Sequence, residues 1–275
     1  TIKYVLISLR ADNKGEGGIL ALFSLVKKMR MKWLYLIAII GASALIADGV
    51  ITPSLTVMAS IEGLKQIDGL ELGISPILGI TTVILVFIFV VQQFGTSFIG
   101  KFFGPVMVIW FLFLGTMGVI NLQYHPEILK SFNPYYAFKL IVNSPNALWI
   151  LGAVFLCTTG AEALYSDLGH CGAKNIRVSW FFVKIMLILN YLGQGSWLLE
   201  NYNMVFTGTN PFFGMLPQFL IIPAVILATA AAIIASQALI TGSFTIFSEA
   251  MSLNFWPFQQ IEYPSGLKGQ MYIPR

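Results

Sequence analysis

Residues 33–62 read WLYLIAIIGASALIADGVITPSLTVMASIE, and this stretch decides the fold. It is almost entirely apolar up to Glu62 at its end. A helix needs about 20 predominantly apolar residues to cross the hydrocarbon core of a bilayer. The stretch is therefore long enough to span a membrane as a helix. Asp48, near its middle, is the acidic residue that such a helix would carry into the membrane.

Further apolar stretches of membrane-spanning length follow this one. They are residues 76–93, 103–122, 148–164, 178–199 and 216–247. A shorter apolar run at residues 2–9 cannot span a bilayer by itself. We therefore predict an all-α membrane protein with about six full transmembrane helices and the end of another.

The composition supports a membrane protein. Hydrophobic residues make up 57% of the 275 residues and charged residues 10%, whereas a soluble domain carries about 25% charge. The net charge of +4 does not indicate nucleic-acid binding, because the positive charges lie in short loops between apolar runs. Cys157 and Cys171 have neither metal-ligand spacing nor the pattern of a disulfide framework.

Lysine and arginine residues concentrate in alternate loops, and such loops face the cytoplasm. On this rule residues 10–32 form a cytoplasmic loop, residues 33–247 hold the membrane helices with an extracellular loop at 123–147, and residues 248–275 are cytoplasmic. We expect a multi-pass protein of the plasma membrane. Both ends of the chain look cut, so we expect it to be part of a longer polypeptide.

Asp48 lies near two residues that weaken its helix, Gly49 and Pro53. Pro53 removes a backbone donor and frees the carbonyl of Gly49, which can bind a cation where it lines a cavity. Thr52 and Thr56 follow Asp48 by four and eight residues, on the same helix face. Ionisable residues inside membranes usually serve an ion path, so we predict that Asp48, Thr52 and Thr56 bind a cation. The alternative is a proline-kinked helix whose aspartate pairs with a lysine or with the backbone.

Glu162 lies near the end of the stretch at 148–164, three residues after Thr159. Gly160 between them allows the helix to loosen, and transporters place ions at such half-broken helices. We therefore predict that Thr159 and Glu162 complete the cation site. The alternative is that Glu162 marks a helix end at the membrane interface, as Asp167 could equally do.

The donor types indicate the ion. Carboxylate, hydroxyl and carbonyl oxygens suit a hard cation, and one or two acids suit a monovalent ion better than a dehydrated divalent one. A carboxyl group buried in a membrane can take up a proton near neutral pH. Glu162 and Asp48 are therefore candidates for coupling protons to the cation.

Several short motifs occur in an order that resembles one family of transporters. They are RADNKGEGG at 10–18, DGVITP at 48–53, GT at 95–96 with FGPV at 103–106, FNP at 132–134, EALYSDLGH at 162–170, ASQA at 235–238 and GQMYIP at 269–274. With these motifs the chain resembles the KUP/HAK/KT family of potassium transporters over nearly its whole length.

The resemblance implies a LeuT-like (APC) inverted-repeat transporter fold of about twelve helices, with potassium as substrate and proton symport. Residues 1–9 would then be the end of helix two, and the long stretches helices three to eight. The family's helix-one motif and its later helices do not occur in this chain, which is therefore expected to be truncated. The ion site would combine helix one with side chains of helices three and six, namely Asp48, Thr52, Thr56, Thr159 and Glu162.

We therefore expect potassium uptake across the plasma membrane by proton–potassium symport with alternating access. A passive cation channel is the alternative, although a channel filter usually repeats one carbonyl loop in symmetric subunits. An enzyme is not expected, because the apolar stretches contain no histidine and the chain has no zinc-protease or serine-hydrolase motif. The expected partners are the potassium ion, the proton and the lipid bilayer, with no cofactor and no nucleic acid. The oligomeric state stays open, a homodimer included.

Overall fold

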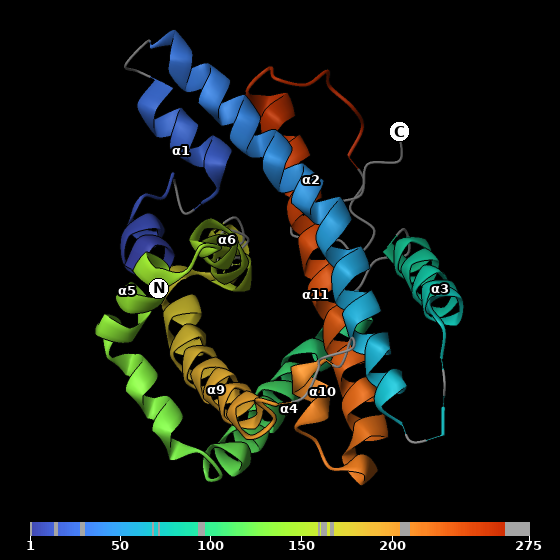
Figure 1. Ribbon diagram of the computed structural model, residues 1–275. Helices are drawn as coiled ribbons and strands as arrows, with labels where there is room; N and C mark the ends of the chain where they lie inside the picture. Colours follow the sequence, from blue (N-terminus) through green and yellow to red (C-terminus); the bar gives the residue numbers. More distant parts are fainter. Residues whose placement is uncertain are drawn as a thin grey trace.

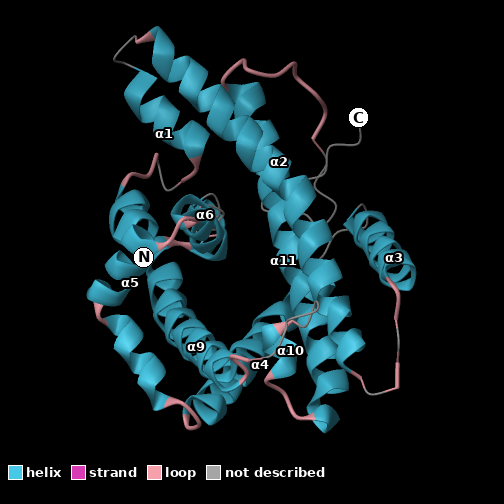
Figure 2. Ribbon diagram, in the orientation of Figure 1, coloured by secondary structure: helices cyan, strands magenta, loops and turns pink. Residues whose placement is uncertain are grey.

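The computed structural model shows helices joined by turns and loops, and no β-sheet within the residues that it describes (Figures 1 and 2). The structure describes residues 2–13, 16–27, 31–67, 69–70, 72–92, 97–158, 160, 164–165, 168–203 and 210–261.

The helices follow one another along the chain with short 3-10 and π turns between them. In order they are η1 (Ile2–Ile7), η2 (Ser8–Arg10), α1 (Ile19–Val26), α2 (Lys32–Glu62), η4 (Gly63–Gln66), α3 (Ile74–Gln92), α4 (Ser97–Leu122), η5 (Pro126–Phe132), α5 (Pro134–Asn143), α6 (Ala147–Thr158), α8 (Leu168–Cys171), α9 (Ala173–Glu200), α10 (Pro211–Gly214) and α11 (Gln218–Ser252).

The long helices have the dimensions and composition of membrane spans. In the described part of the chain five helices, namely α2, α3, α4, α9 and α11, are long and apolar enough to cross a bilayer, and α6 is a shorter apolar helix. Large apolar side chains such as Val50, Phe181 and Phe219 are exposed on their outer faces. Water would disfavour so much exposed apolar surface, whereas lipid accommodates it. These features confirm the prediction of an all-α membrane protein.

Several helix boundaries differ from those read from hydropathy, and those of α4 and α6 differ most. Helix α4 begins at Ser97, ahead of the apolar stretch at 103–122, and Pro105 lies inside it. Hydropathy marks the part of a helix that lipid would cover, whereas backbone hydrogen bonds decide where the helix starts. Helix α6 ends at Thr158, short of the 164 expected from its apolar run. The predicted loop at 123–147 is itself folded into η5 and α5.

Helices α4 and α9 cross at glycines. A Cβ on Gly193 would lie 2.5 Å from Cα of Gly118, and a Cβ on Gly118 would collide with the carbonyl of Leu189. Small residues at such crossings let helix backbones approach closely, which drives helix association in membranes. Beside the crossing, the fully buried Ser196 hydroxyl donates to the carbonyl of Asn121 at 2.8 Å. Helices α4 and α9 therefore form one closely packed pair.

Helices α2 and α11 run alongside each other over most of their length (Figure 1). Gly49 of α2 packs on the hydroxyl of Ser243 in α11, with no room for a Cβ. Further along, Val57 is fully buried against Ala232 and Ile240 of α11 and Ile88 of α3. Helix α10 and the start of α11 join this pair to α4 through a second apolar cluster that includes Phe213 and Met117.

The α4–α9 crossing gives a test of the fold. Gly193→Ala adds a methyl group against the backbone of Gly118, and overpacking of this kind costs about 1–3 kcal/mol. We expect the detergent-solubilised full-length protein to melt several degrees lower. Gly79→Ala is the matched control, because a Cβ on Gly79 meets nothing within 4 Å and gains the same helix propensity. Equal melting temperatures for the two variants would contradict the crossing.

Candidate functional site

The site starts at a weakened turn of α2. Pro53 lies inside this helix and has no N–H to bond the carbonyl of Gly49. The helix nevertheless continues on both sides of it, from Lys32 to Glu62. A free backbone carbonyl in a membrane helix is tolerated where it lines a cavity or is buried in protein. The Gly49 carbonyl therefore lacks its usual helical hydrogen-bond donor.

Asp48 and Thr52 form a hydrogen-bonded pair next to this turn. The Thr52 hydroxyl donates to Oδ1 of Asp48 at 2.5 Å. The Thr56 hydroxyl, one turn further on, donates to the carbonyls of Thr52 at 2.9 Å and Pro53 at 3.2 Å. All three side chains are half-buried. The structure thus brings Asp48, Thr52 and Thr56 together as one column, as their spacing predicts.

These hydrogen bonds leave the oxygens of the column suited to a cation. Each hydroxyl gives its proton to a neighbouring oxygen, so its lone pairs remain free. Asp48 makes no ion pair with a lysine or arginine in the described part of the chain; the ion pairs found there are Lys65–Glu62 and Lys130–Glu127. The alternative of an aspartate neutralised by a neighbouring lysine is therefore not what the described residues show.

Helix α11 holds the column in place from one side. Gly49 and Pro53 are buried, and Gly49 packs against Ser243 of α11. The buried face of α2 is thereby fixed on α11. Asp48, Thr52 and Thr56 lie on the adjacent face, at the edge of the contact. This arrangement anchors the helix while it leaves the column accessible.

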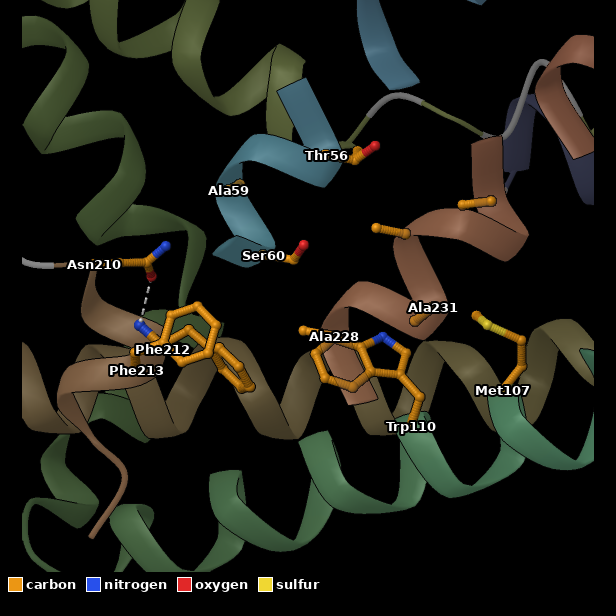
Figure 3. Close-up of a pocket in the computed structure, with 12 residues that line it drawn as sticks. Thr56, Ala59, Ser60, Met107, Trp110, Asn210, Phe212, Phe213, Ala228 and Ala231 are labelled. Atoms are coloured by element: carbon orange, nitrogen blue, oxygen red, sulfur yellow. Dashed lines mark hydrogen bonds between the residues drawn. The ribbon is translucent and has the colours of Figure 1, made fainter. Parts of the chain in front are cut away.

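A cavity of about 320 Å³ opens beside the end of the column, as Figure 3 shows. Thr56 and Ser60 line it from α2, facing alanines of α11, and Trp110 reaches it from α4. Its full lining is Thr56, Ala59, Ser60, Met107, Trp110, Asn210, Phe212, Phe213, Ala228, Ala231, Ala232 and Ala235.

The cavity wall contains few polar groups, and those of Ser60 and Asn210 are held by hydrogen bonds. The Ser60 hydroxyl donates to the carbonyl of Val57 at 2.7 Å and accepts from the Thr229 hydroxyl at 3.2 Å. The side-chain oxygen of Asn210 accepts from the backbone N–H of Phe212 at 3.0 Å and so caps α10. Most of the remaining wall is alanine, methionine and aromatic rings. The hydroxyls of Thr56 and Ser60 therefore form the polar part of the α2 side of the cavity.

Sequence reasoning identified the column but not the cavity. Ser60 lies four residues after Thr56, so the same helical spacing could have found it. Trp110 and Asn210 carry no local signal, because only the packing of α4 against α11 and of α10 against η4 and α9 brings them there.

Thr159 and Glu162 lie outside the described residues, so the structure does not report whether they meet Asp48. What it shows is the chain around them. Helix α6 ends at Thr158, and Gly160 has a φ of 103°, which is outside helical geometry. Helix α6 makes its main contacts with α5. The expected interruption at Gly160 is therefore observed, and the roles of Thr159 and Glu162 remain predictions.

The described part of the chain contains no cluster of three or more histidine, cysteine, aspartate or glutamate side chains that could hold a metal ion. The donors beside Asp48 are instead one carboxylate, two hydroxyls and backbone carbonyls. Such oxygen donors suit a hard ion that is held reversibly.

Comparison with known proteins agrees with this chemistry. The family described as "K+ potassium transporter integral membrane domain" matches residues 1–275. The chain is 52% identical to the probable potassium transport system protein Kup of Flavobacterium johnsoniae, 53% to that of Cytophaga hutchinsonii and 54% to Kup 1 of Lactococcus lactis. Each alignment covers 100% of this chain and 42% of the relative. No solved structure gives a significant match.

These matches confirm the predicted family, and the relatives are named as potassium transport proteins and not as enzymes. They also confirm a multi-pass integral membrane protein, which in bacteria lies in the plasma membrane. The chain spans less than half the length of these relatives. Since the family match extends from its first residue to its last, the chain belongs to the K+ potassium transporter family through this integral membrane domain.

Proposed function

We propose that the full protein takes up potassium across the plasma membrane by proton–potassium symport with alternating access. The observation that carries the proposal is the column of Asp48, Thr52 and Thr56 beside the freed carbonyl of Gly49. It supplies a negative charge and neutral oxygens in the middle of a membrane helix. The names of the relatives support potassium as the ion.

In this mechanism potassium exchanges its water for the oxygens of the column. The Asp48 carboxylate supplies the charge, while the Thr52 hydroxyl keeps its hydrogen bond to Asp48 and turns its lone pairs to the ion. Thr56 and the Gly49 carbonyl add neutral oxygens. The cavity next to Thr56 holds the ion's water as it arrives or leaves. Because lipid-buried charge is costly, the site favours an occupied state over an empty charged one.

Thr159 and Glu162 complete the site in our proposal. The observed break at Gly160 supports this assignment, because interrupted helices offer free carbonyls and helix ends to ions. Glu162 and Asp48 exchange protons with the two sides of the membrane as the site alternates.

The overall arrangement we propose is a LeuT-like (APC) inverted-repeat fold. Residues 1–9 end helix two, residues 10–32 form a cytoplasmic loop, residues 33–247 hold helices three to eight with an extracellular loop at 123–147, and residues 248–275 are cytoplasmic. The positive charges of alternate loops support this orientation.

The role of Asp48 is tested by Asp48→Asn in a full-length transporter. Asparagine keeps the volume and can still accept the hydrogen bond from Thr52, so the helix should fold. Removing the charge from a buried ion pair costs about 3–5 kcal/mol, so we expect rubidium uptake to fall by about a hundredfold or more. Rescue of potassium-uptake-deficient cells at low external potassium should be lost. Normal rescue by this variant would overturn the proposed site.

Thr52→Ala tests the neutral oxygens. A hydrogen bond to a charged group contributes about 1.5–3 kcal/mol, so we expect the KM for potassium to rise by about tenfold or more. Ser54→Ala is the matched control, because Ser54 is an exposed hydroxyl of the same helix whose donor bonds the carbonyl of Val50. Thr52→Ser should restore most of the affinity. If Thr52→Ala behaved like Ser54→Ala, Thr52 would not be a ligand.

Glu162→Gln tests the proton coupling. We expect uptake by this variant to lose its dependence on the pH gradient, because glutamine cannot carry the proton. The measurement is rubidium uptake into proteoliposomes with and without an imposed pH gradient. Coupling that is unchanged from the wild type would exclude Glu162, and uptake that ignores the gradient in the wild type, with unitary currents, would indicate a channel instead.

A further inference from the structure

Tyr165 connects two segments that lie far apart in the sequence. Its hydroxyl donates to the carbonyl of Ala11 at 2.5 Å, across 154 positions of the chain. Its side chain is only 4% exposed and packs with Val5, Leu9 and Leu168 in one apolar cluster. We call this contact, made of Tyr165, Leu168, Ala11 and Gly17, the Tyr165 joint.

Gly17 closes the joint from the other side. A Cβ on Gly17 would collide with the backbone carbonyl of Tyr165 and would lie 2.9 Å from Cβ of Leu168 and 3.0 Å from Cδ2 of Tyr165. Its φ is not in the left-handed region, so glycine is required here by space and not by backbone conformation. A backbone carbonyl cannot change rotamer as a side chain can. The segments that contain Gly17 and Tyr165 are therefore in close contact that leaves no room for a side chain at residue 17.

The Tyr165 hydroxyl remains a donor under physiological conditions. Burial raises the pKa of Tyr165, and the carboxylates of Asp12 and Glu249 raise it further. A higher pKa keeps the phenol protonated at neutral pH. The hydrogen bond to Ala11 is therefore permanent with respect to ordinary changes in pH.

From the joint, a continuous series of contacts leads to α1. Asn13 and Glu16 exchange backbone hydrogen bonds of 2.8 and 3.1 Å, which closes the loop before α1. The side-chain amide of Asn13 donates to the Ser24 hydroxyl of α1 at 2.9 Å. Ser24 in turn donates to the carbonyl of Ala21 at 2.6 Å. The loop is thus fastened to α1 by its own side chains.

Helix α1 then packs on the first half of α2 (Figure 1). Leu20 and Phe23 of α1 form one buried cluster with Ala38 and Ala42 of α2. A Cβ on Gly41 would lie 3.0 Å from Cδ1 of Ile19, so these helices are also in close contact there. Asp48 follows Ala42 by six residues, which is about 9 Å along a helix at 1.5 Å per residue.

We propose that Tyr165 is a positioning residue for the ion site, which links the segment that follows Glu162 to the helix that carries Asp48. Tyr165 lies three residues after Glu162, and its joint is fastened through the loop and α1 to α2. When the site alternates, Tyr165 and Leu168 move as one body with α1 and the start of α2. The inference rests on the proposed function, because it assigns Glu162 and Asp48 to one site.

Tyr165→Phe in a full-length transporter tests the proposal. It removes one hydrogen bond and keeps the ring in its cluster. We expect the KM for potassium, per folded transporter, to rise by about three- to tenfold, which is the range for losing one hydrogen bond. Gly17→Ala should act in the same direction more strongly. Tyr4→Phe is the matched control, because Tyr4 packs against the same cluster and its hydroxyl makes no hydrogen bond to a described residue.

Two further measurements separate positioning from a purely structural role. Links in one series of contacts should be non-additive, so Tyr165→Phe combined with Ser24→Ala should raise KM by less than the product of the single effects. The same cycle with Tyr4→Phe should be additive. Hydrogen exchange of α1 and the start of α2 should also rise in Tyr165→Phe and not in Tyr4→Phe.

The outcomes are distinct. If Tyr165→Phe lowers only the amount of folded protein and leaves KM at the control value, the proposal is overturned. Unchanged hydrogen exchange of α1 and α2 overturns it as well, and this measurement needs no transport. A wild-type protein that takes up no potassium, or that ignores the proton gradient, overturns the proposed function instead.

Discussion

The cost of placing a carboxylate in a membrane helix governs the rest of this site. Lipid offers no hydrogen bonds, so every polar group on α2 must be satisfied within the protein or by an ion. Asp48 receives one hydrogen bond from Thr52 and, within the described residues, no basic partner. Its charge is therefore only partly compensated. In our proposal a potassium ion supplies the missing compensation.

The same imbalance explains why α2 is anchored so firmly on its other face. Proline removes a backbone hydrogen bond and favours a kink, so contacts on both sides of Pro53 are needed to keep α2 on its neighbours. Gly49 on Ser243, and Val57 within its cluster, hold it on α11 on either side of Pro53. Helices α4 and α9 form a second closely packed pair, which crosses at glycines. Trp110 and Phe213 pack between this pair and the α2–α11 pair, next to the cavity. The oxygens of the column therefore lie at the edge of a well-packed scaffold.

Local sequence pattern was sufficient for those features that depend on one helix. It predicted the extent of α2 and the column at Asp48, because hydropathy and a spacing of four residues are properties of a single helix. It also anticipated the interruption at Gly160. It gave the start of α4 wrongly and missed Trp110, Asn210 and the Tyr165 joint. Each of these depends on backbone hydrogen bonds or on contacts between distant segments, for which hydropathy carries no signal.

Close glycine contacts and interrupted helices have different roles in the proposed transport mechanism. Where glycine meets backbone, as at Gly193 and Gly17, the two segments are in close contact, and separating them would lose packing on both sides. Where the helix is interrupted, as at Gly160, or lacks a backbone bond, as at Pro53, the chain can change shape at small cost. Asp48 is near Pro53 in the sequence, and Glu162 is near Gly160. The close contact at Gly17 belongs to the Tyr165 joint. In our proposal the ion binds beside these weakened places, and the Tyr165 joint links the segment that follows Glu162 to the helix that carries Asp48.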